Sequence, residues 1–380
     1  MLFLYFTEDG RMKILFVITG LGIGGAERQL LDLADRLSIR GHQILIAYLT
    51  GPARLLPTNP GIKVVPLGIS KNPFTFIVSY LRLRRLICDF KPDVVHSHMV
   101  HANLLARIER MTTKIPWLVC TAHNTDEEGK LRMIAYRLTD FLADIFTNVS
   151  NEAVEAFEAK GAAPPGRMLA VYNGIDTQKF SPDCQTRYSY RNRLNVGSEK
   201  MILAVGRLWE QKDYPSLLSA FAEIASKNEN VKLWIVGEGP LRRSLESMTA
   251  ELSLSERVMF LGTLPDNDIP DLMRAADVFV LSSAWEGFGL VVAEAMATEK
   301  VVVATDSGGV KEVVGDCGLL VVPQDSEALA HALEKALSMS PEQAKILGEK
   351  ARQRIVEMFS LDSAMDRWLE IYSASNAYLY

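Results

Sequence analysis

The sequence lacks any hydrophobic run of the roughly 20 residues that a membrane-spanning helix needs. Its apolar start, 1–6, is much shorter than the core of a signal peptide, and acidic residues follow it at once. Cysteine is also scarce, because the 380 residues contain only four, dispersed and without a pair at metal-ligand spacing. Dispersed cysteines are typical of a reducing compartment, so we expect a cytoplasmic protein. The first strong strand pattern begins after Met12, so we expect residues 1–11 to be a loose tail or the product of an upstream start.

The sequence also has no large excess of positive or negative charge. The net charge is −5 at pH 7, and we expect no nucleic-acid partner. The charges are unevenly placed, since residues 1–175 carry 20 Lys and Arg against 16 Asp and Glu, whereas residues 176–380 carry 21 against 30. A basic first half suits an anionic acceptor or surface on that side only. The length and the hydrophobic fraction of 48% predict two or three globular domains with ample core.

Strand patterns alternate with helical patterns in two series. The first series has strands at 13–19, 42–50, 64–67, 93–96, 117–121 and 144–150, and the second has strands at 202–207, 232–236, 258–262, 277–281 and 301–305. A Pro-Pro-Gly break at 164–166 precedes the end of the first series, and we interpret the polar segment 180–197 as a linker. This alternation predicts an α/β fold with doubly wound parallel sheets, which bind ligands at the carboxyl ends of their strands.

The stretch 282–296 has the pattern of an anion site. The strand at 277–281 leads into a tight turn with Gly287 and Gly289, and a helical pattern starts at Leu290. A helix start leaves backbone N–H groups unpaired, and these groups attract anions. The groups concerned belong to Phe288, Gly289 and Leu290.

Two acidic residues, Glu286 and Glu294, bracket this turn with seven residues between them. A carboxylate beside a phosphate is unfavourable unless it binds hydroxyl groups instead, and sugar and ribose hydroxyls meet that need. The stretch therefore indicates a sugar nucleotide. The alternative is an ordinary strand-turn-helix crossover with two solvated glutamates.

Two cations follow the first strand of the second series. That strand ends in Gly206 and Arg207, and Lys212 lies five residues further on. Arg207 can bind a diphosphate as a fork and Lys212 as a point charge. The alternative is a pair of surface cations near a helix start, where the helix dipole makes cations unfavourable. An anion would explain that placement.

The first loop resembles a dinucleotide-binding fingerprint, with glycines at 20, 22 and 25. That fingerprint also requires an acidic residue about twenty positions on, at the end of the second strand. The sequence has none at 40–46, so a nicotinamide-dependent dehydrogenase is disfavoured.

Several residues suggest metal or polar chemistry at strand ends. His96, His98 and His101 could form a metal site, but no acid or cysteine completes the set, and we favour a polar lining for a cleft. His123 follows the next strand and is either structural or functional. The acidic residues at 266–268 precede a helix, where Asp is a common cap, so we interpret them as capping.

Taken together, these motifs resemble the family 4 retaining glycosyltransferases, which have the GT-B fold. The resemblance rests on the paired glutamates around Gly-Phe-Gly, on Gly-Gly-Ala-Glu-Arg at 24–28, on Asn-Gly-Ile-Asp at 173–176, and on Arg207 with Lys212. It covers nearly the whole chain from Met12. It implies two Rossmann-like domains facing a cleft. The first, 12–175 with a last helix at 361–380, would bind the acceptor, and the second, 176–360, would bind the donor.

The resemblance also implies roles for single residues. Arg207 and Lys212 would stabilise the departing diphosphate, Glu294 would hold the ribose, Glu286 would hold sugar hydroxyls, and His123 would face the donor sugar. Further donor contacts are implied at Gly24, Gly25, Gly206 and Gly262 and at the turn of Phe288, Gly289 and Leu290. The leaving phosphate itself is the base in many accounts of this family, so no protein base is required.

The implied reaction transfers a hexose-type sugar, with retention, from a nucleoside diphosphate to a hydroxyl of a glycan or lipid-linked glycan, as in cell-surface polysaccharide assembly. UDP is favoured over GDP. We expect no cofactor and no metal, because two cations and a helix start already neutralise the diphosphate. The alternatives are a small soluble acceptor, a phosphorylase or epimerase on the same fold, and a non-catalytic sugar-nucleotide-binding protein.

The segment 73–89 has the pattern of a helix with an unusually wide apolar face. On a helical projection one narrow polar face holds Thr75, Ser79, Arg82, Arg85 and Asp89, and Arg84 lies on the opposite side. An arginine among apolar side chains can reach lipid headgroups. We therefore predict weak contact with an anionic membrane at its cytoplasmic face, and the alternative is a mostly buried crossover helix.

Overall fold

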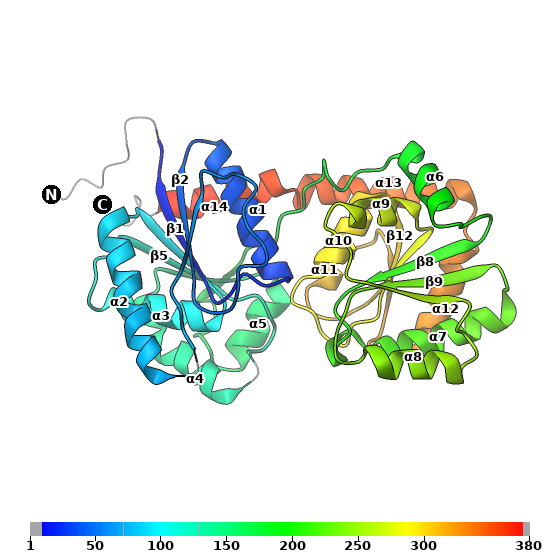
Figure 1. The fold of residues 1–380 in the computed structure, drawn as a ribbon, viewed down its shortest axis with the longest axis horizontal. Helices are drawn as coiled ribbons and strands as arrows, with labels where there is room; N and C mark the ends of the chain where they lie inside the picture. Colours follow the sequence, from blue (N-terminus) through cyan, green and yellow to red (C-terminus); the bar gives the residue numbers. More distant parts are fainter. Residues whose placement is uncertain (1–9, 71, 128, 375–380) are drawn as a thin grey trace. The chain divides into compact units, whose positions relative to one another are not determined.

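The computed structural model describes residues 10–70, 72–127 and 129–374, and it divides into two compact units (Figure 1). Unit 1 runs up to Gly174 and takes up the chain again at Leu361, and unit 2 is the continuous segment Ile175–Ser360. The sequence placed the same division one residue later, between 175 and 176. Residues 1–9 and 375–380, which include most of the expected tail and the end of the expected last helix, lie outside the described residues.

A parallel sheet of seven strands forms the centre of unit 1, in the order β3-β2-β1-β4-β5-β6-β7. Its strands are β1 (Lys13–Ile18), β2 (Gln43–Tyr48), β3 (Lys63–Pro66), β4 (Val94–His98), β5 (Trp117–Thr121), β6 (Ile145–Asn148) and β7 (Met168–Ala170). Its helices are α1 (Gly25–Ile39), α2 (Pro73–Phe90), α3 (Val100–Arg110), α4 (Lys130–Thr139), α5 (Asn151–Ala159) and α14 (Leu361–Ser373), with the 3-10 turn η1 (Asp140–Leu142). The central strands are buried on both faces because helices cover the sheet from both sides, which explains their nearly unbroken apolar sequence.

Unit 2 has a parallel sheet of six strands in the order β10-β9-β8-β11-β12-β13. Its strands are β8 (Lys200–Val205), β9 (Val231–Val236), β10 (Val258–Gly262), β11 (Val278–Leu281), β12 (Val301–Thr305) and β13 (Leu319–Val321). Its helices are α6 (Cys184–Arg193), α7 (Tyr214–Lys227), α8 (Arg242–Glu251), α9 (Asp268–Ala275), α10 (Leu290–Ala297), α11 (Val310–Val314), α12 (Ser326–Leu337) and α13 (Pro341–Met358), with the 3-10 turn η2 (Glu210–Lys212). The two sheets confirm the predicted α/β class with doubly wound parallel sheets.

Each sheet changes its winding direction at one point. In unit 1 the change falls between β1 and β4, and in unit 2 it falls between β8 and β11. Ligands of doubly wound folds bind at the carboxyl ends of the strands beside such a switch point. In unit 2 the loops that leave this edge are 206–213 and 282–289, which hold the predicted cations and glutamate turn.

Helix α14 completes the core of unit 1. Trp368 and Tyr372 of this helix are 7% and 0% exposed, and they belong to the hydrophobic cluster on the face of the sheet that α1 covers. An ion pair of 2.7 Å joins Asp366 to Arg40 at the end of α1. The last helix is therefore a structural part of unit 1.

The segment that the sequence marked as a linker, 180–197, contains helix α6, so the linker interpretation was wrong. Asp183 caps this helix through its side chain. Arg187 and Arg191 of α6 both pair with Asp277, which directly precedes β11, at 2.7 and 3.1 Å. The polar residues of the segment thus hold α6 against α9 and the start of β11, rather than marking an irregular loop.

Helix α2 packs on the sheet through a stripe different from the expected one. Ser79, assigned to the solvated polar face, is fully buried and donates a hydrogen bond to the Leu67 carbonyl at 2.9 Å. Arg82 donates to the same carbonyl at 2.8 Å. The buried stripe runs from Ser79 through Leu83 to Ile87, which are spaced by four residues.

Five large apolar side chains on the other side of α2 are exposed, at 73% for Phe74, 41% for Phe76, 56% for Ile77, 44% for Val78 and 54% for Leu81. The alternative of a mostly buried helix was therefore wrong.

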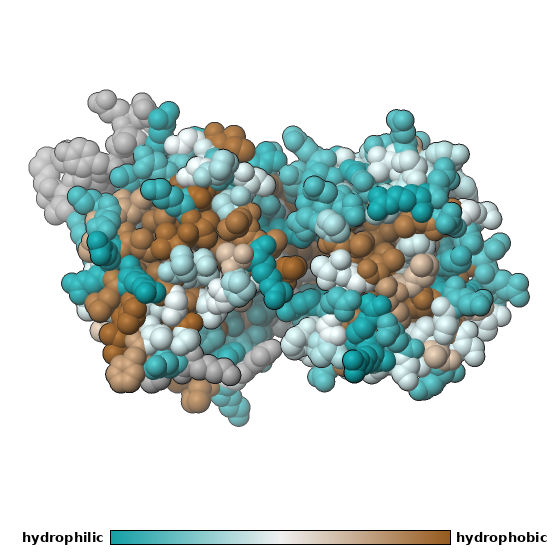
Figure 2. Space-filling model, viewed as in Figure 1, coloured by the Kyte–Doolittle hydropathy of each residue, from teal (hydrophilic) through white to brown (hydrophobic). Residues whose placement is uncertain are grey.

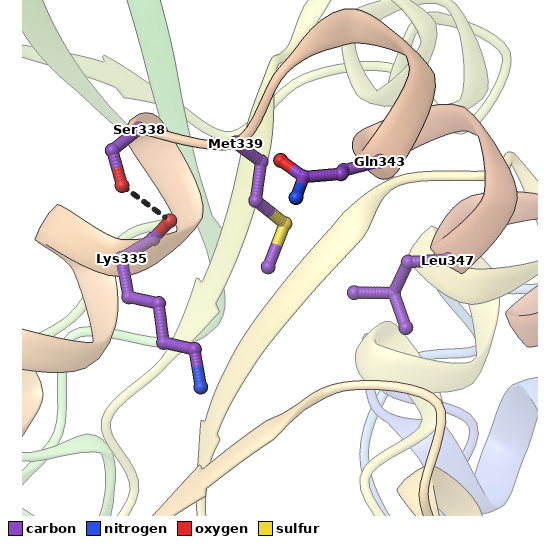
Figure 3. Close-up of a pocket in the computed structure, with 5 residues that line it drawn as sticks. All are labelled: Lys335, Ser338, Met339, Gln343 and Leu347. Atoms are coloured by element: carbon purple, nitrogen blue, oxygen red, sulfur yellow. Dashed lines mark hydrogen bonds between the residues drawn. The ribbon is translucent and has the colours of Figure 1, made fainter.

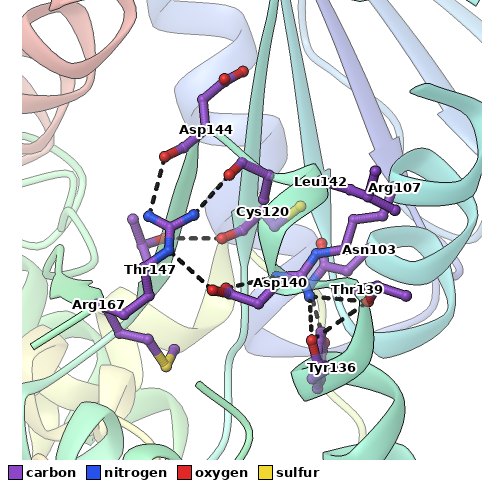
Figure 4. A network of polar contacts seen from close by, with 12 residues as sticks. Asn103, Arg107, Cys120, Tyr136, Thr139, Asp140, Leu142, Asp144, Thr147 and Arg167 are labelled. Carbon is purple, nitrogen blue, oxygen red and sulfur yellow. Dashed lines mark hydrogen bonds and ion pairs between the residues drawn. The ribbon is translucent and has the colours of Figure 1, made fainter. Parts of the chain in front are cut away.

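A buried polar network holds α4 against α3 in unit 1 (Figure 4). The Arg107 side chain is fully buried, donates to the Tyr136 carbonyl at 3.0 Å and lies over the Phe146 ring, 4.4 Å from its centroid. Arg167 donates to Asp140 at 3.0 Å. A buried guanidinium is tolerated only with such partners. The network fixes the helix that follows the loop after β5.

Candidate functional site

Two loops of unit 2 are joined where β8 and β11 end. The backbone N–H of Ala284 donates to the Gln211 carbonyl at 2.8 Å, and the Gln211 side chain donates to the Trp285 carbonyl at 2.9 Å. The Ser282 hydroxyl donates to the Lys212 carbonyl at 2.7 Å. These three bonds hold the cation loop and the glutamate turn as one assembly at the switch point.

Lys212 and Glu286, which the sequence assigned to different parts of a ligand, form an ion pair with each other. The Ser283 hydroxyl donates a second hydrogen bond to the same Glu286 oxygen, at 2.8 Å. Both charged side chains are largely buried, at 14% and 11% exposed. A buried ion pair with an added hydrogen bond fixes both side chains, so the Lys212 ammonium is presented in one position.

Arg207 stands in contrast to Lys212. Its side chain is exposed, and its guanidinium lies 5.7 Å from the centroid of the exposed Trp209 ring. Within the described part of the chain, no carboxylate lies at ion-pairing distance from Arg207. Its guanidinium therefore keeps its donors for an incoming anion, and Trp209 limits its motion.

Glycines allow the loops of unit 2 to pack this closely. A Cβ on Gly206 would lie 3.2 Å from both the Lys212 side chain and the Tyr214 hydroxyl. A Cβ on Gly308, at φ +59°, would lie 1.7 Å from the Glu286 carbonyl oxygen, and one on Gly237, at φ +138°, would lie 1.9 Å from the Gly206 carbonyl oxygen. Gly237 and Gly308 therefore require glycine, whereas a side chain at Gly206 would crowd Lys212 and Tyr214. The loop after β9 thus packs on the loop after β8, and the loop after β12 packs on the glutamate turn.

The start of α10 lies in the same assembly. Gly289 adopts the left-handed conformation at φ +85° and ψ 49° and is the residue that precedes the helix. Phe288 is only 3% exposed, and its ring packs against Phe359, 5.7 Å between centroids. Glu294 is 5% exposed within α10. Gly262, at the end of β10, has φ +69° and accepts a hydrogen bond from Gly237 N–H at 2.9 Å.

In unit 1 the predicted glycines lie at the start of α1. Gly24 precedes the helix with an extended backbone and accepts a hydrogen bond from Arg28 N–H at 3.2 Å, and Gly25 is the first helical residue. Gln29 of the same helix exchanges two hydrogen bonds with the Gly174 backbone, at 2.6 and 2.7 Å. The glycine loop therefore lies at the carboxyl end of β1, beside the switch point of unit 1.

The histidines of unit 1 form a layer that the sequence did not predict. His96 is fully buried, and its two ring nitrogens bond to the Tyr372 hydroxyl and to the Thr121 hydroxyl, both at 2.7 Å. His98 is 3% exposed, so neither residue is the open cleft lining that we expected. Nδ1 of His98 lies 3.0 Å from Nε2 of His123. Burial lowers the pKa of His123 to about 4 and holds the pKa values of the other two well below the usual value.

The histidines that could have bound a metal ion do not have the geometry of a metal site. Both His96 nitrogens already have partners, and His101 is exposed on α3. Across residues 10–70, 72–127 and 129–374, no three His, Cys, Asp or Glu side chains gather as metal ligands. The capping interpretation of 266–268 was only partly right, because Asn267 occupies the cap without a side-chain bond, whereas Asp268 lies in the first turn of α9.

A separate hollow of about 420 Å³ lies between α12 and α13 of unit 2 (Figure 3). It is lined by Lys335, Ser338, Met339, Gln343 and Leu347, none of which the sequence singled out. Ser338 donates a hydrogen bond to the Lys335 carbonyl beside it. With one cation and no acid, this hollow offers no chemistry comparable to the switch-point assembly.

The described helices include none that is both long and apolar enough to span a bilayer.

Comparisons with known proteins identify the family of the chain. Residues 23–179 match the family model for Glycosyltransferase Family 4, and residues 187–354 match that for Glycosyl transferases group 1. A D-inositol 3-phosphate glycosyltransferase of Corynebacterium urealyticum is 31% identical over 304 residues, covering 74% of this chain and 71% of the relative. A UDP-Gal:alpha-D-GlcNAc-diphosphoundecaprenol alpha-1,3-galactosyltransferase of Escherichia coli is 27% identical over 308 residues, covering 77% and 78%.

Among solved structures, HepE of Anabaena in complex with UDP and glucose superposes with a TM-score of 0.85 at 24% identity, covering 96% of this chain and 100% of that one. The fold is therefore the GT-B fold of two Rossmann-like parallel-sheet units. The chain belongs to the glycosyltransferases of family 4 and group 1.

Proposed function

We propose that the protein is a retaining glycosyltransferase that moves a hexose-type sugar from a nucleoside diphosphate, with UDP favoured, to a hydroxyl of a glycan or lipid-linked glycan. The observation that carries the proposal is the assembly at the β8/β11 switch point, where Lys212, Glu286 and the start of α10 are held together beside Arg207. Unit 2 would bind the donor and unit 1 the acceptor.

The cations supply the main catalytic effect in this proposal. Negative charge grows on the departing diphosphate as the glycosidic bond breaks, and a transition state is stabilised by groups already in place. Lys212 is held in place by Glu286, and Arg207 has uncommitted donors. The backbone N–H groups at the start of α10 add a third positive region. No metal ion is needed for this charge, and we propose that none is used.

The glutamates bind hydroxyl groups. Glu294 would accept hydrogen bonds from the ribose, which the donor and the released nucleotide share. Glu286 has its oxygen Oε1 bound to Lys212 and Ser283, and its other oxygen would accept hydrogen bonds from the transferred sugar. In this arrangement Lys212 bridges the sugar-binding carboxylate and the diphosphate. His123 of unit 1 would contact the same sugar.

Two further features favour a lipid-linked acceptor. The relative from Escherichia coli is named for a diphosphoundecaprenol acceptor. The exposed apolar side chains of α2 lie beside exposed Arg84 and Arg85, and Figure 2 shows hydrophobic and hydrophilic residues interleaved where Figure 1 places α2. Apolar side chains with flanking arginines suit the headgroup region of an anionic membrane. We propose that α2 makes this contact, at the cytoplasmic face.

The proposal is tested with the purified full chain and a panel of UDP- and GDP-linked hexoses, each with and without a polyprenyl-diphosphate-linked sugar. We expect release of nucleoside diphosphate that depends on the acceptor, and a product whose new linkage keeps the donor's anomeric configuration by NMR. Donor binding without release would instead identify a non-catalytic sugar-nucleotide-binding protein. A chelator arm tests the metal, because activity lost to EDTA and restored by manganese would contradict metal independence.

A further inference from the structure

His98 and His123 form a pair of imidazole rings at the carboxyl ends of β4 and β5. Nδ1 of His98 lies 3.0 Å from Nε2 of His123, and the ring planes are inclined by 28°. Nε2 of His98 is buried, and no hydrogen-bond partner for it lies among the described residues. The other nitrogen of His123, Nδ1, makes no hydrogen bond to any residue in the described part of the chain.

Both rings are neutral near pH 7. Burial is the largest cause that lowers the pKa of His98 and of His123, the latter to about 4. Repulsion from His96 and His123 lowers the pKa of His98 further. A neutral imidazole carries one proton, so one nitrogen is a donor and the other an acceptor.

The geometry leaves two ways to place the two protons. If His123 donated from Nε2, the proton of His98 would have to lie on its own Nε2, which is buried without an acceptor. If His98 donates from Nδ1, its buried Nε2 is a bare nitrogen, and His123 carries its proton on Nδ1. A buried N–H without a partner is rarer and less favourable than a buried acceptor without one.

We propose that His98 is a positioning residue that fixes His123 in the tautomer with its proton on Nδ1. His123 then presents an N–H donor, and no lone pair, toward the ligand. It binds a hydroxyl or carbonyl oxygen of the substrate and does not act as a general base. The identity of that ligand as the donor sugar rests on the proposed function, whereas the tautomer does not.

The surrounding backbone holds His98 in place for this role. Met99, the next residue, has φ +72° and ψ 157°, a region that residues other than glycine rarely occupy. Its N–H donates to the Thr121 carbonyl and its carbonyl accepts from Asn103 N–H, at 3.0 and 2.9 Å. The Asn103 side chain donates to that Thr121 carbonyl and to the Tyr136 hydroxyl, both at 3.0 Å. The chain thus turns from β4 directly into α3 under strain, with His98 at the bend.

The experiment measures the ring-nitrogen chemical shifts of His123 in the 15N-labelled full-length protein, because these shifts separate N–H from bare nitrogen. His123→Gln assigns the signals. In the wild type we expect the proton on Nδ1 of His123 and on Nδ1 of His98. His98→Asn keeps an N–H donor near the position of His98 Nδ1 and should preserve the tautomer. His98→Leu removes the donor, and the share of His123 with its proton on Nδ1 should fall.

Two results would overturn the proposal: a wild-type His123 protonated on Nε2, or a tautomer that stays the same in His98→Leu. His331→Asn, at an exposed position of α12 in unit 2, controls for general effects of losing a histidine. Transfer kinetics test the ligand separately. We expect at least a 10-fold fall in kcat/KM in His98→Leu and recovery in His98→Asn. If the tautomer responds as expected and the kinetics do not, the assignment of His123 to the donor sugar fails, while its positioning by His98 stands.

Discussion

At the scale of single residues, the two predicted clamp cations differ in their surroundings, and this difference predicts two kinds of mutant. Arg207 is exposed beside Trp209, whereas Lys212 shares a buried ion pair with Glu286. Arg207→Ala should therefore lower turnover by about 10²-fold or more with little change in the melting temperature, as expected for loss of one donor to transition-state charge. Lys212→Ala should lower both turnover and melting temperature, because it leaves the largely buried carboxylate of Glu286 without its partner. Full activity in Arg207→Ala would refute the clamp, and Arg243→Ala, at an exposed position of α8, is the matched control.

We expect the two glutamates to affect the binding of different ligands. Glu294→Gln should weaken binding of donor and free nucleoside diphosphate alike, since both contain the ribose. Glu286→Gln should weaken binding of the intact donor and lower turnover, but leave the affinity for free nucleoside diphosphate nearly unchanged. Titration calorimetry with both ligands distinguishes these cases. Equal losses of diphosphate affinity in the two variants would contradict the assigned roles.

Residue types and strand patterns were enough to predict which side chains lie near the ends of β8 and β11, but not how they pair. Arg207, Lys212 and Glu286 could be identified because each follows an apolar strand pattern. The ion pair of Lys212 with Glu286 joins residues 74 positions apart, and its formation depends on the register of β8 beside β11. The same applies to Gly237 and Gly308, whose need for glycine arises from contacts with distant loops.

At the scale of secondary-structure elements, helix α2 predicts weak and salt-sensitive membrane attachment. Each arginine near anionic lipid contributes about 1 kcal/mol. Of the three arginines in 82–85, Arg82 is partly engaged with the Leu67 carbonyl, so Arg84 and Arg85 should dominate. Co-sedimentation with anionic liposomes at low salt should fall in an Arg84→Ser, Arg85→Ser double variant.

A second variant tests the apolar part of the same contact. Ile77→Ser with Leu81→Ser removes two exposed side chains and should also reduce co-sedimentation, without lowering the melting temperature. Wild-type protein that stays in the supernatant at low salt would show that α2 does not bind the membrane. Neutral liposomes are the control for charge.

The histidine layer on β4 and after β5 predicts that unit 1 loses stability in acid. Burial makes the pKa values of His96, His98 and His123 lower in the folded chain than the unfolded value of 6.5. Below pH 6.5 the unfolded chain therefore binds more protons, so stability is full above that pH and falls as the pH drops toward about 4. Each histidine adds a slope of up to about 1.4 kcal/mol per pH unit. Urea unfolding from pH 7.5 to 4.5 measures this slope, which should be smaller in His98→Asn and unchanged in His331→Asn.

The elements missed from the sequence share a physical reason. Helix α6 has too few apolar residues to show an amphipathic pattern. Its position depends on the ion pairs of Arg187 and Arg191 with Asp277. Strands β7 and β13 have three residues each, too few for a periodic signal, and pairing with a neighbouring strand defines them. Long central strands such as β1 were predictable because burial on both faces requires an apolar sequence.

At the scale of the whole molecule, the return of the chain to unit 1 predicts unequal effects of truncation. A chain that stops after Ser360 keeps all of unit 2 but loses Trp368 and Tyr372 from the core of unit 1. Removing a buried aromatic side chain costs about 3–5 kcal/mol, and two such losses approach the whole stability of a domain. Limited proteolysis should then digest unit 1 and spare a fragment corresponding to 175–360. A chain truncated after Ala374 should resist proteolysis as well as the full chain does. If unit 1 resists equally in the two truncated chains, the prediction is contradicted.

The return of α14 also sets the order in which the units can finish folding on the ribosome. The chain emerges from its amino terminus, so the seven strands of unit 1 are made first. Yet their core lacks Trp368 and Tyr372 until every residue of unit 2 has been synthesised. Unit 2, although second in the sequence, is the first that can fold to completion. The half-covered sheet of unit 1 is thus the part of the nascent chain that must be protected from aggregation for the longest time.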